Sequence, residues 1–311
     1  YAHTIADEIH QNQRGLRGVA RTKLTFVSDR NGERLVGPVD NRTNKEVYIS
    51  DYDGRNPQRV TVNRSLNITP SWSADGRAIA YTSYRRGFSD VFVSFIYEGR
   101  LETPADGNPK EQNWLPAWSP DGRQIAFTSN RDGNPELYIV DIDGSNRRQL
   151  TSDSGNRKPS WNHDGTKIVF VSSRDGGKSI YTMDADGTNQ SRVTESRNEA
   201  DWPVWSPDGT KIIYQNTESG NTDIWIIGAD GTGDIRLTDD MANNTYPSTW
   251  RTILREPLVF VQEIGTSGSG DGEFDLPRDV AVASDGSVYV SDTPNGMMGA
   301  QRRIQKFSIG P

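Results

Sequence analysis

Few side chains in this chain could carry acid–base or nucleophilic chemistry. It has three histidines, His3, His10 and His163, and no cysteine. A Ser-His-Asp site needs a base beside its nucleophile, and the Gly-x-Ser-x-Gly turn that presents such a serine in many hydrolases does not occur in the sequence. The lack of cysteine also excludes thiolate catalysis, disulfides and cysteine-bound zinc. We therefore expect no catalytic residue of these classes.

The carboxylates are numerous, but 13 of the 29 aspartates precede glycine, where forming a turn explains them. Three segments of the type Asp-x-Asp-Gly, ending at Gly54, Gly144 and Gly187, resemble calcium loops, yet their glycine is at the fourth position and not the sixth. The glycine-rich segment 265–272 lies between two expected strands, which is the wrong context for binding phosphate. We expect no metal site or cofactor from these motifs, and calcium held in a central channel stays open.

Composition and charge exclude two kinds of partner. The 311 residues carry a formal net charge of −7, and the positive charges are scattered, so no basic stripe could neutralise a nucleic acid backbone. No apolar run approaches the roughly 18 residues needed to cross a bilayer. Neither a nucleic acid partner nor a membrane-spanning segment is expected.

A tryptophan recurs along the chain with nearly constant spacing. The repeats are Trp72, Trp118, Trp161, Trp205 and Trp250, at intervals of 46, 43, 44 and 45 residues. The first four each begin a pentapeptide that ends in Asp-Gly, such as Trp118-Ser-Pro-Asp-Gly122. Such a period indicates a repeat architecture in which each unit must stack on its neighbours. We expect the tryptophans to fill the space between units.

Each unit contains the signals of four short strands. The first Asp-Gly turn is followed by a strand-like run (78–82, 124–128, 167–171 and 211–214), a polar loop, a second run such as 136–140 or 222–227, a second tight turn and a short strand. This pattern is typical of β-propeller blades. Strands at 23–27, 46–49 and 59–61 begin the first blade, and a C-terminal strand would complete it. We therefore predict an all-β, six-bladed propeller over residues 21–311, with four antiparallel strands per blade.

These residues resemble the TolB-type propeller family. The resemblance rests on the Trp-Ser-Pro-Asp-Gly repeats and on the segments 1–9, 21–27 and 50–54, and it covers about 21–250 of the propeller. It implies that the short N-terminal helix, with its linker to residue 20, is the remnant of a preceding α/β domain. Residues from about 257 to 311, including Asp285-Gly-Ser-Val-Tyr-Val290, instead resemble an NHL repeat, which is also a propeller blade.

The resemblance implies a non-enzymatic periplasmic protein of the Tol–Pal envelope system. It would bind a Pal-like peptidoglycan-associated lipoprotein, and other Tol or envelope proteins could be further partners. Two alternatives stay open at this point. One is a structural scaffold in an envelope or extracellular assembly, and the other is a propeller enzyme such as an NHL-like lyase or a calcium-dependent lactonase.

The expected contact surface is formed by the loops that lead into the innermost strands, which we call the approach loops. They span residues 63–69, 108–115, 153–158, 196–202 and 240–246, and would surround the mouth of the central channel. Aromatic and arginine side chains dominate protein interfaces because they bury much area at low entropic cost. The same aromatics could instead cap the packing between blades. The predicted partner-binding residues are Gln112, Asn113, Trp114, Leu115, Arg157, Lys158, Asp201, Trp202, Thr245 and Tyr246.

Overall fold

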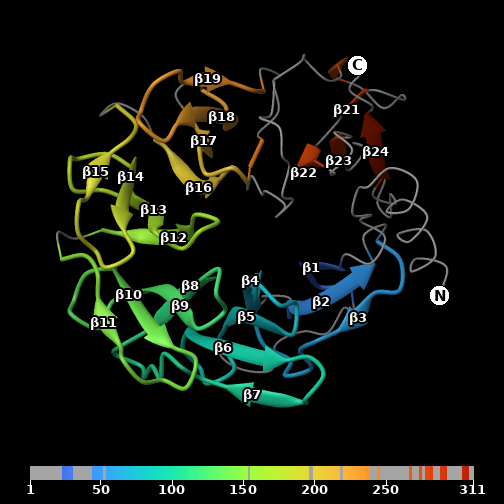
Figure 1. The fold of residues 1–311 in the computed structure, drawn as a ribbon. Helices are drawn as coiled ribbons and strands as arrows, with labels where there is room; N and C mark the ends of the chain where they lie inside the picture. Colours follow the sequence, from blue (N-terminus) through green and yellow to red (C-terminus); the bar gives the residue numbers. More distant parts are fainter. Residues whose placement is uncertain are drawn as a thin grey trace.

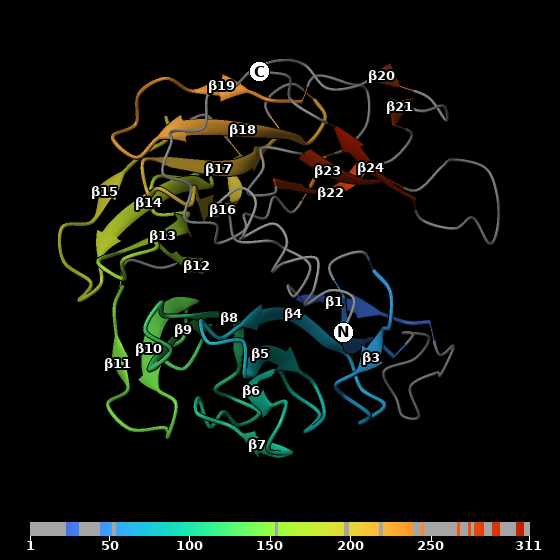
Figure 2. The same ribbon diagram turned by 45° about the vertical axis from the view of Figure 1, so that its right-hand side comes forward.

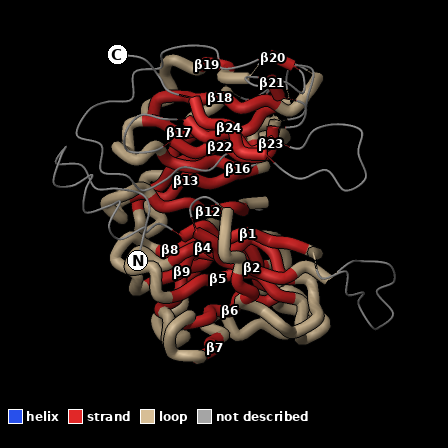
Figure 3. The backbone as a smooth tube through the Cα atoms, turned by 90° about the vertical axis from the view of Figure 1, so that its right-hand side faces the viewer, coloured by secondary structure: helices blue, strands red, loops and turns tan. Residues whose placement is uncertain are grey.

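The computed structural model describes residues 23–30, 44–51, 54–152, 155–195, 199–217, 220–238 and 244–245. It also describes the backbone of five short C-terminal strands between residues 266 and 307. Within this part of the chain the secondary structure is strand and turn, without a helix (Figure 3). The helix expected near residues 1–9, with its linker to residue 20, lies outside the described residues.

Four sheets have four antiparallel strands each, and a fifth has three. The first blade contains β1 (Lys23–Ser28), β2 (Glu46–Asp51) and β3 (Gln58–Arg59). The second contains β4 (Asn67–Trp72), β5 (Ala78–Ser83), β6 (Asp90–Phe95) and β7 (Arg100–Glu102), and the third β8 (Asn113–Trp118), β9 (Gln124–Ser129), β10 (Glu136–Asp141) and β11 (Arg148–Gln149). The fourth contains β12 (Arg157–Trp161), β13 (Lys167–Ser172), β14 (Ser179–Asp184) and β15 (Ser191–Arg192), and the fifth β16 (Asp201–Trp205), β17 (Lys211–Asn216), β18 (Asp223–Gly228) and β19 (Ile235–Arg236).

The blades follow one another around a common axis. The strands β4, β8, β12 and β16 are innermost, and β7, β11, β15 and β19 form the rim (Figure 1). Inner strands of consecutive blades lie side by side, as the turned view also shows (Figure 2). The repeated Asp-Gly turns join the first and second strands. At Gly122 the backbone has a φ of 71°, which glycine adopts without a Cβ clash.

The expected six four-stranded blades are wrong, because the described residues form a five-bladed propeller. The sequence indicated nearly the right number of strands, but it did not show which strands belong to the same sheet. The C-terminal strand that was to complete the first blade, β24 (Arg303–Phe307), instead pairs with β23 (Val288–Asp292). Together with β22 (Pro277–Val282) they form a three-stranded antiparallel sheet, and β20 (Thr266–Ser267) pairs in parallel with β21 (Glu273–Phe274). Within the described residues, β1 pairs with β2 alone.

Alternate residues of a strand pack against different neighbouring blades. In β5, Ile79 and Tyr81 belong to the core shared with the first blade, whereas Ala78 and Ala80 belong to the core shared with the third. Successive side chains of a strand point to opposite faces of its sheet, so each middle blade has two buried faces. The strands therefore read as nearly continuous apolar runs.

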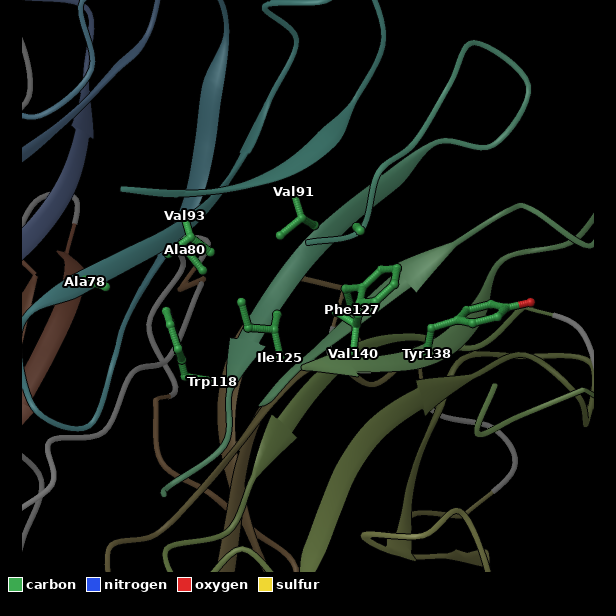
Figure 4. Close-up of a cluster of buried hydrophobic side chains, with 10 residues drawn as sticks. Ala78, Ala80, Val91, Val93, Trp118, Ile125, Phe127, Tyr138 and Val140 are labelled. Carbon is green, nitrogen blue, oxygen red and sulfur yellow. The ribbon is translucent and has the colours of Figure 1, made fainter. Parts of the chain in front are cut away.

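The recurring tryptophans pack where the sequence predicts. Trp118 of the third blade is 7% exposed and lies among side chains of the second blade (Figure 4). Trp72, Trp161 and Trp205 each pack in the same way against the blade that precedes their own. The indole Nε1–H of Trp161 also donates to the carbonyl oxygen of Ala117, at 3.2 Å, across the boundary between blades. Their role between blades is confirmed for these four; Trp250 lies outside the described residues.

Truncating one of these tryptophans should open a cavity between two blades. We expect Trp118→Ala to lower the free energy of unfolding by about 3–5 kcal/mol, because the lost indole contacts are only partly recovered by relaxation. Tyr97→Ala is the control, since Tyr97 is 74% exposed, and it should change the free energy by less than about 0.5 kcal/mol. Urea unfolding measures both values. Equal effects of the two substitutions would contradict the assigned packing.

Candidate functional site

The approach loops lie at the same face of the ring as the loops that join second and third strands. Arg131, just after β9, forms an ion pair with Glu111 of an approach loop, at 3.2 Å. The neighbouring Asn130 accepts a hydrogen bond from the backbone N–H of Gln112, at 2.7 Å. We call this face the approach face. The described approach loop of the third blade is thus held by an ion pair and a hydrogen bond, so this part of the surface is preformed.

A buried polar pair repeats beneath this face, where one blade meets the next. The residue that begins the third strand of a blade carries a carboxylate, and the residue that leads into the following inner strand is an asparagine. The carboxylates are Glu46, Asp90 and Glu136, and the asparagines are Asn67, Asn113 and Asn156. Asn156 donates to Glu136 at 2.8 Å, and Asn113 donates to Asp90 at 2.9 Å. Burial raises the pKa of Asp90, and the hydrogen bond from Asn113 acts against that shift.

The junction between the fourth and fifth blades lacks this pair. Ser179 stands at the carboxylate position and Ala200 at the asparagine position, and both are buried. The backbone bond of the other junctions is kept, since the N–H of Ala200 donates to the carbonyl oxygen of Lys178, at 3.1 Å. An unpaired buried carboxylate or amide costs free energy, so the two positions change together. This fourth junction is therefore built differently from its neighbours.

Each inner strand has a bulge at the residue before its proline. That residue has a positive φ in four consecutive blades, and the ladder register shifts around it. The residues are Thr69 (52°), Leu115 (58°), Lys158 (60°) and Trp202 (51°). A left-handed conformation is rare outside glycine, and such strain persists only where surrounding contacts hold it.

The contact that holds the bulge also changes at the fourth junction. The backbone N–H groups of Leu115 and Lys158 donate to the hydroxyls of Thr82 and Thr128 in the preceding blade, at 2.9 and 3.3 Å. The residue equivalent to these threonines in the fourth blade is Val171, which has no hydroxyl. The N–H of Trp202 instead donates to the Asp201 carboxylate, at 2.9 Å.

Asp201 thereby becomes the centre of a charged cluster on the approach face. The Nζ atom of Lys158 lies 2.5 Å from Asp201 Oδ1 and 4.1 Å from the ring centroid of Trp202. The Nζ atom of Lys178 lies 3.6 Å from Asp201 Oδ2 and 3.5 Å from Glu199. We call Arg157, Lys158, Lys178, Asp201 and Trp202 the fourth-junction cluster. It joins a cation–π contact to a partly desolvated ion pair.

Burial is the main influence on the Lys158 ammonium. Desolvation lowers the pKa of Lys158 below its ordinary value of 10.5, and the positive charges of Lys178 and Arg157 act in the same direction. The Asp201 carboxylate raises it through the hydrogen bond and its charge. The ammonium is therefore held in place by one carboxylate against several opposing influences.

The structure places the predicted residues of the third blade in different environments. Asn113 is buried, and its side chain is used in the junction pair with Asp90. Gln112 accepts a hydrogen bond from the Ser89 hydroxyl, at 3.1 Å. Trp114 and Leu115 are half-buried, so part of each remains accessible on the approach face. Gln112 is also half-buried, so of these four residues only Asn113 lacks the exposure that a contact surface needs.

The predicted residues of the other blades also occupy different environments. Lys158, Asp201 and Trp202 contact one another in the fourth-junction cluster, and the charge of the neighbouring Arg157 acts on Lys158. Thr245 is half-buried in a separate segment, and Tyr246 lies outside the described residues. Sequence reasoning missed Lys178. Its position in a loop between second and third strands, which share the approach face, was the signal that could have identified it.

The described residues include no group of three or more histidine, cysteine, aspartate or glutamate side chains that could hold a metal ion. In the same part of the chain, no helix is long and apolar enough to cross a membrane. Several aspartates outside the junctions serve turns. Asp121, for example, accepts hydrogen bonds from the Ser119 hydroxyl and the Arg123 N–H, and these bonds lower the pKa of Asp121.

Comparison with known proteins points to one family. A model of the TolB beta propeller domain matches residues 11–218. The Tol-Pal system protein TolB of Desulfosudis oleivorans is 37% identical over 93 residues, which are 30% of this chain and 19% of that protein. The crystal structure of TolB from Acinetobacter baumannii superposes with a TM-score of 0.68 at 22% identity, covering 97% of this chain and 65% of that one. This chain thus spans only part of the length of these relatives.

The same fold occurs in an enzyme. The oligogalacturonate lyase of Vibrio parahaemolyticus superposes with a TM-score of 0.55 at 13% identity, over 87% of this chain and 67% of that one. Similarity at this level of identity shows a shared fold alone, because one fold hosts many functions.

The assigned electrostatics can be tested by two substitutions with opposite effects. Asp201→Asn should lower the pKa of Lys158 further, because burial remains while the compensating carboxylate is lost. Lys178→Met should raise the pKa of Lys158, because it removes a repelling charge. A pH titration of the lysine 13Cε resonance by NMR gives both values. A wild-type midpoint at or above 10.5, or shifts of the same sign in both variants, would contradict the cluster as described.

Proposed function

Because the chain belongs to the TolB beta propeller domain family, we propose that it is a non-enzymatic, periplasmic, protein-binding propeller of the Tol–Pal system. Its approach face binds a Pal-like peptidoglycan-associated lipoprotein. Other Tol or envelope proteins are further candidate partners. The observation that carries the proposal is the family match over residues 11–218.

The approach face has the properties that binding a folded protein requires. Trp114 and Trp202 are half-buried there and expose part of a large, rigid side chain. Such aromatics contribute much of the binding energy in interfaces, since they bury area with few rotatable bonds. The loop before Trp114 is held by internal hydrogen bonds such as that from Gln112 to Asn130. A preformed surface loses little conformational entropy on association.

The proposal is tested with purified peptidoglycan-associated lipoprotein from a bacterium that has a Tol–Pal system. The double variant Trp114→Ala, Trp202→Ala should bind it at least about tenfold more weakly than wild type, because two central contacts are lost. The matched control is Tyr97→Ala, which truncates an aromatic that is 74% exposed beside the rim strand β7. Titration calorimetry of the three proteins gives the affinities. Binding by the double variant as tight as wild type would remove the approach face from the proposal, and no binding by wild type would remove the partner.

A further inference from the structure

Arg157 has a guanidinium group without a partner in the described part of the chain. Its side chain is half-buried, and its Nε atom is buried without a hydrogen-bond acceptor. Three other arginines, Arg147, Arg192 and Arg236, also have a buried Nε without an acceptor, but each uses a terminal nitrogen for another contact. No such contact joins Arg157 to a described residue. The terminal nitrogens of Arg157 are not among the buried atoms, so an external carboxylate can bind there and offset the partial desolvation of the guanidinium.

The charged side chains near Arg157 carry a net positive charge. Arg157, Lys158 and Lys178 provide three positive charges, whereas Asp201 and Glu199 provide two negative ones. Both lysines already share Asp201, at 2.5 and 3.6 Å. This local excess of positive charge stands out in a chain with a net charge of −7. It favours an acidic ligand over a basic one.

The arrangement is confined to the fourth blade. The two residues before the proline of the inner strand are cationic there, at Arg157 and Lys158, and in no other blade. The equivalent pairs are Ile68 and Thr69, Trp114 and Leu115, Asp201 and Trp202, and Thr245 and Tyr246. The absence of the buried carboxylate at this junction also leaves Arg157 without the acid that the other junctions contain. A local departure from a structural repeat is where a specific role is expected.

We propose that the fourth-junction cluster is a receptor for a carboxylate side chain of the protein partner, with Arg157 as the principal donor and Trp202 as the surface on which the acidic segment packs. This inference rests on the proposed function and names the chemistry of the contact. The planar guanidinium donates two parallel hydrogen bonds to a carboxylate, which a lone ammonium does not. Lys158 stays paired with Asp201 and supplies charge without moving.

The receptor is tested on the intact chain with a defined probe. The probe is the acetylated and amidated peptide Gly-Asp-Glu-Asp-Gly, and its control is Gly-Asn-Gln-Asn-Gly with the same caps. The Nε–H resonance of Arg157, followed by NMR during titration, should move and saturate with the acidic peptide and stay in place with the amide peptide. An unmoved resonance, or equal responses to the two peptides or to inorganic phosphate, would overturn the inference.

Matched variants assign the response to Arg157. Arg157→Gln should bind the acidic peptide about tenfold more weakly, since it loses a charged hydrogen-bond donor. Arg157→Lys keeps the positive charge but loses the planar pair of donors. Its affinity for the acidic peptide should therefore lie between those of wild type and Arg157→Gln. Arg123→Gln is the control, because Arg123 is exposed in a turn at the opposite end of its blade. Wild-type affinity in Arg157→Gln overturns the inference. Should that variant unfold, judged by its thermal midpoint, Arg157→Lys decides.

The lipoprotein separates this inference from the proposed function. If wild type and Arg157→Gln bind the purified lipoprotein equally, the carboxylate receptor is wrong and the proposed function stands. If wild type does not bind the lipoprotein, the proposed function falls, and the peptide titration alone decides whether the receptor exists. Weaker binding of the lipoprotein by Arg157→Gln, with Arg123→Gln unchanged, supports both.

Discussion

Each middle blade of this ring has apolar side chains on both faces, so it is stable only with a neighbour on either side. In β5 the alternation of Ile79 and Tyr81 with Ala78 and Ala80 divides one strand between two cores. The tryptophan of each inner strand from the second to the fifth blade then packs on the preceding blade. Because each middle blade needs apolar contacts on both faces, the blades stack in chain order. That stacking fixes the positions of the loops between their strands.

Polar groups at the junctions add specificity to this apolar packing. A buried carboxylate that accepts from the next blade's asparagine fixes the height of one sheet against another, because the pair is satisfied in one register only. The fourth junction has Ser179 and Ala200 in place of the pair, and it relies on apolar contacts and on the partly desolvated Lys158–Asp201 ion pair. The strained Lys158 and Trp202 stand at that point. The part of the ring that departs most from the repeat is thus also the part where Arg157 has no partner among the described residues.

Much of the fold could be predicted from the sequence, because its strongest signals are local and repeated. The tryptophans, the Asp-Gly turns and the strands that follow them agree with the structure to within about two residues, as for β9 at Gln124–Ser129. The number of blades could not be predicted, since strand counting does not show which strands pair. The pairing of β24 with β23 depends on contacts between segments whose sequences resemble a blade equally well in either arrangement.

The candidate site was predicted less completely, for a physical reason. Proximity to proline and side-chain type identified Arg157, Lys158 and Trp202 as a group, but not which residues are used inside the protein. The pair of Asn113 with Asp90 joins residues 23 positions apart in different blades, and the carboxylate alternates between Asp and Glu along the repeat. The loop position of Lys178 indicated the approach face, but its contact with Asp201 depends on the neighbouring blade.

The central claim is that a buried carboxylate and the following blade's asparagine act as one unit, which the fourth junction has replaced as a whole. The most direct measurement is a double-mutant cycle at the third junction with Glu136→Ser and Asn156→Ala, which copies the residues of the fourth. The account predicts that the double variant is destabilised less than the sum of the single variants, with a coupling of at least about 1 kcal/mol in urea unfolding. Additive effects within about 0.3 kcal/mol would contradict it.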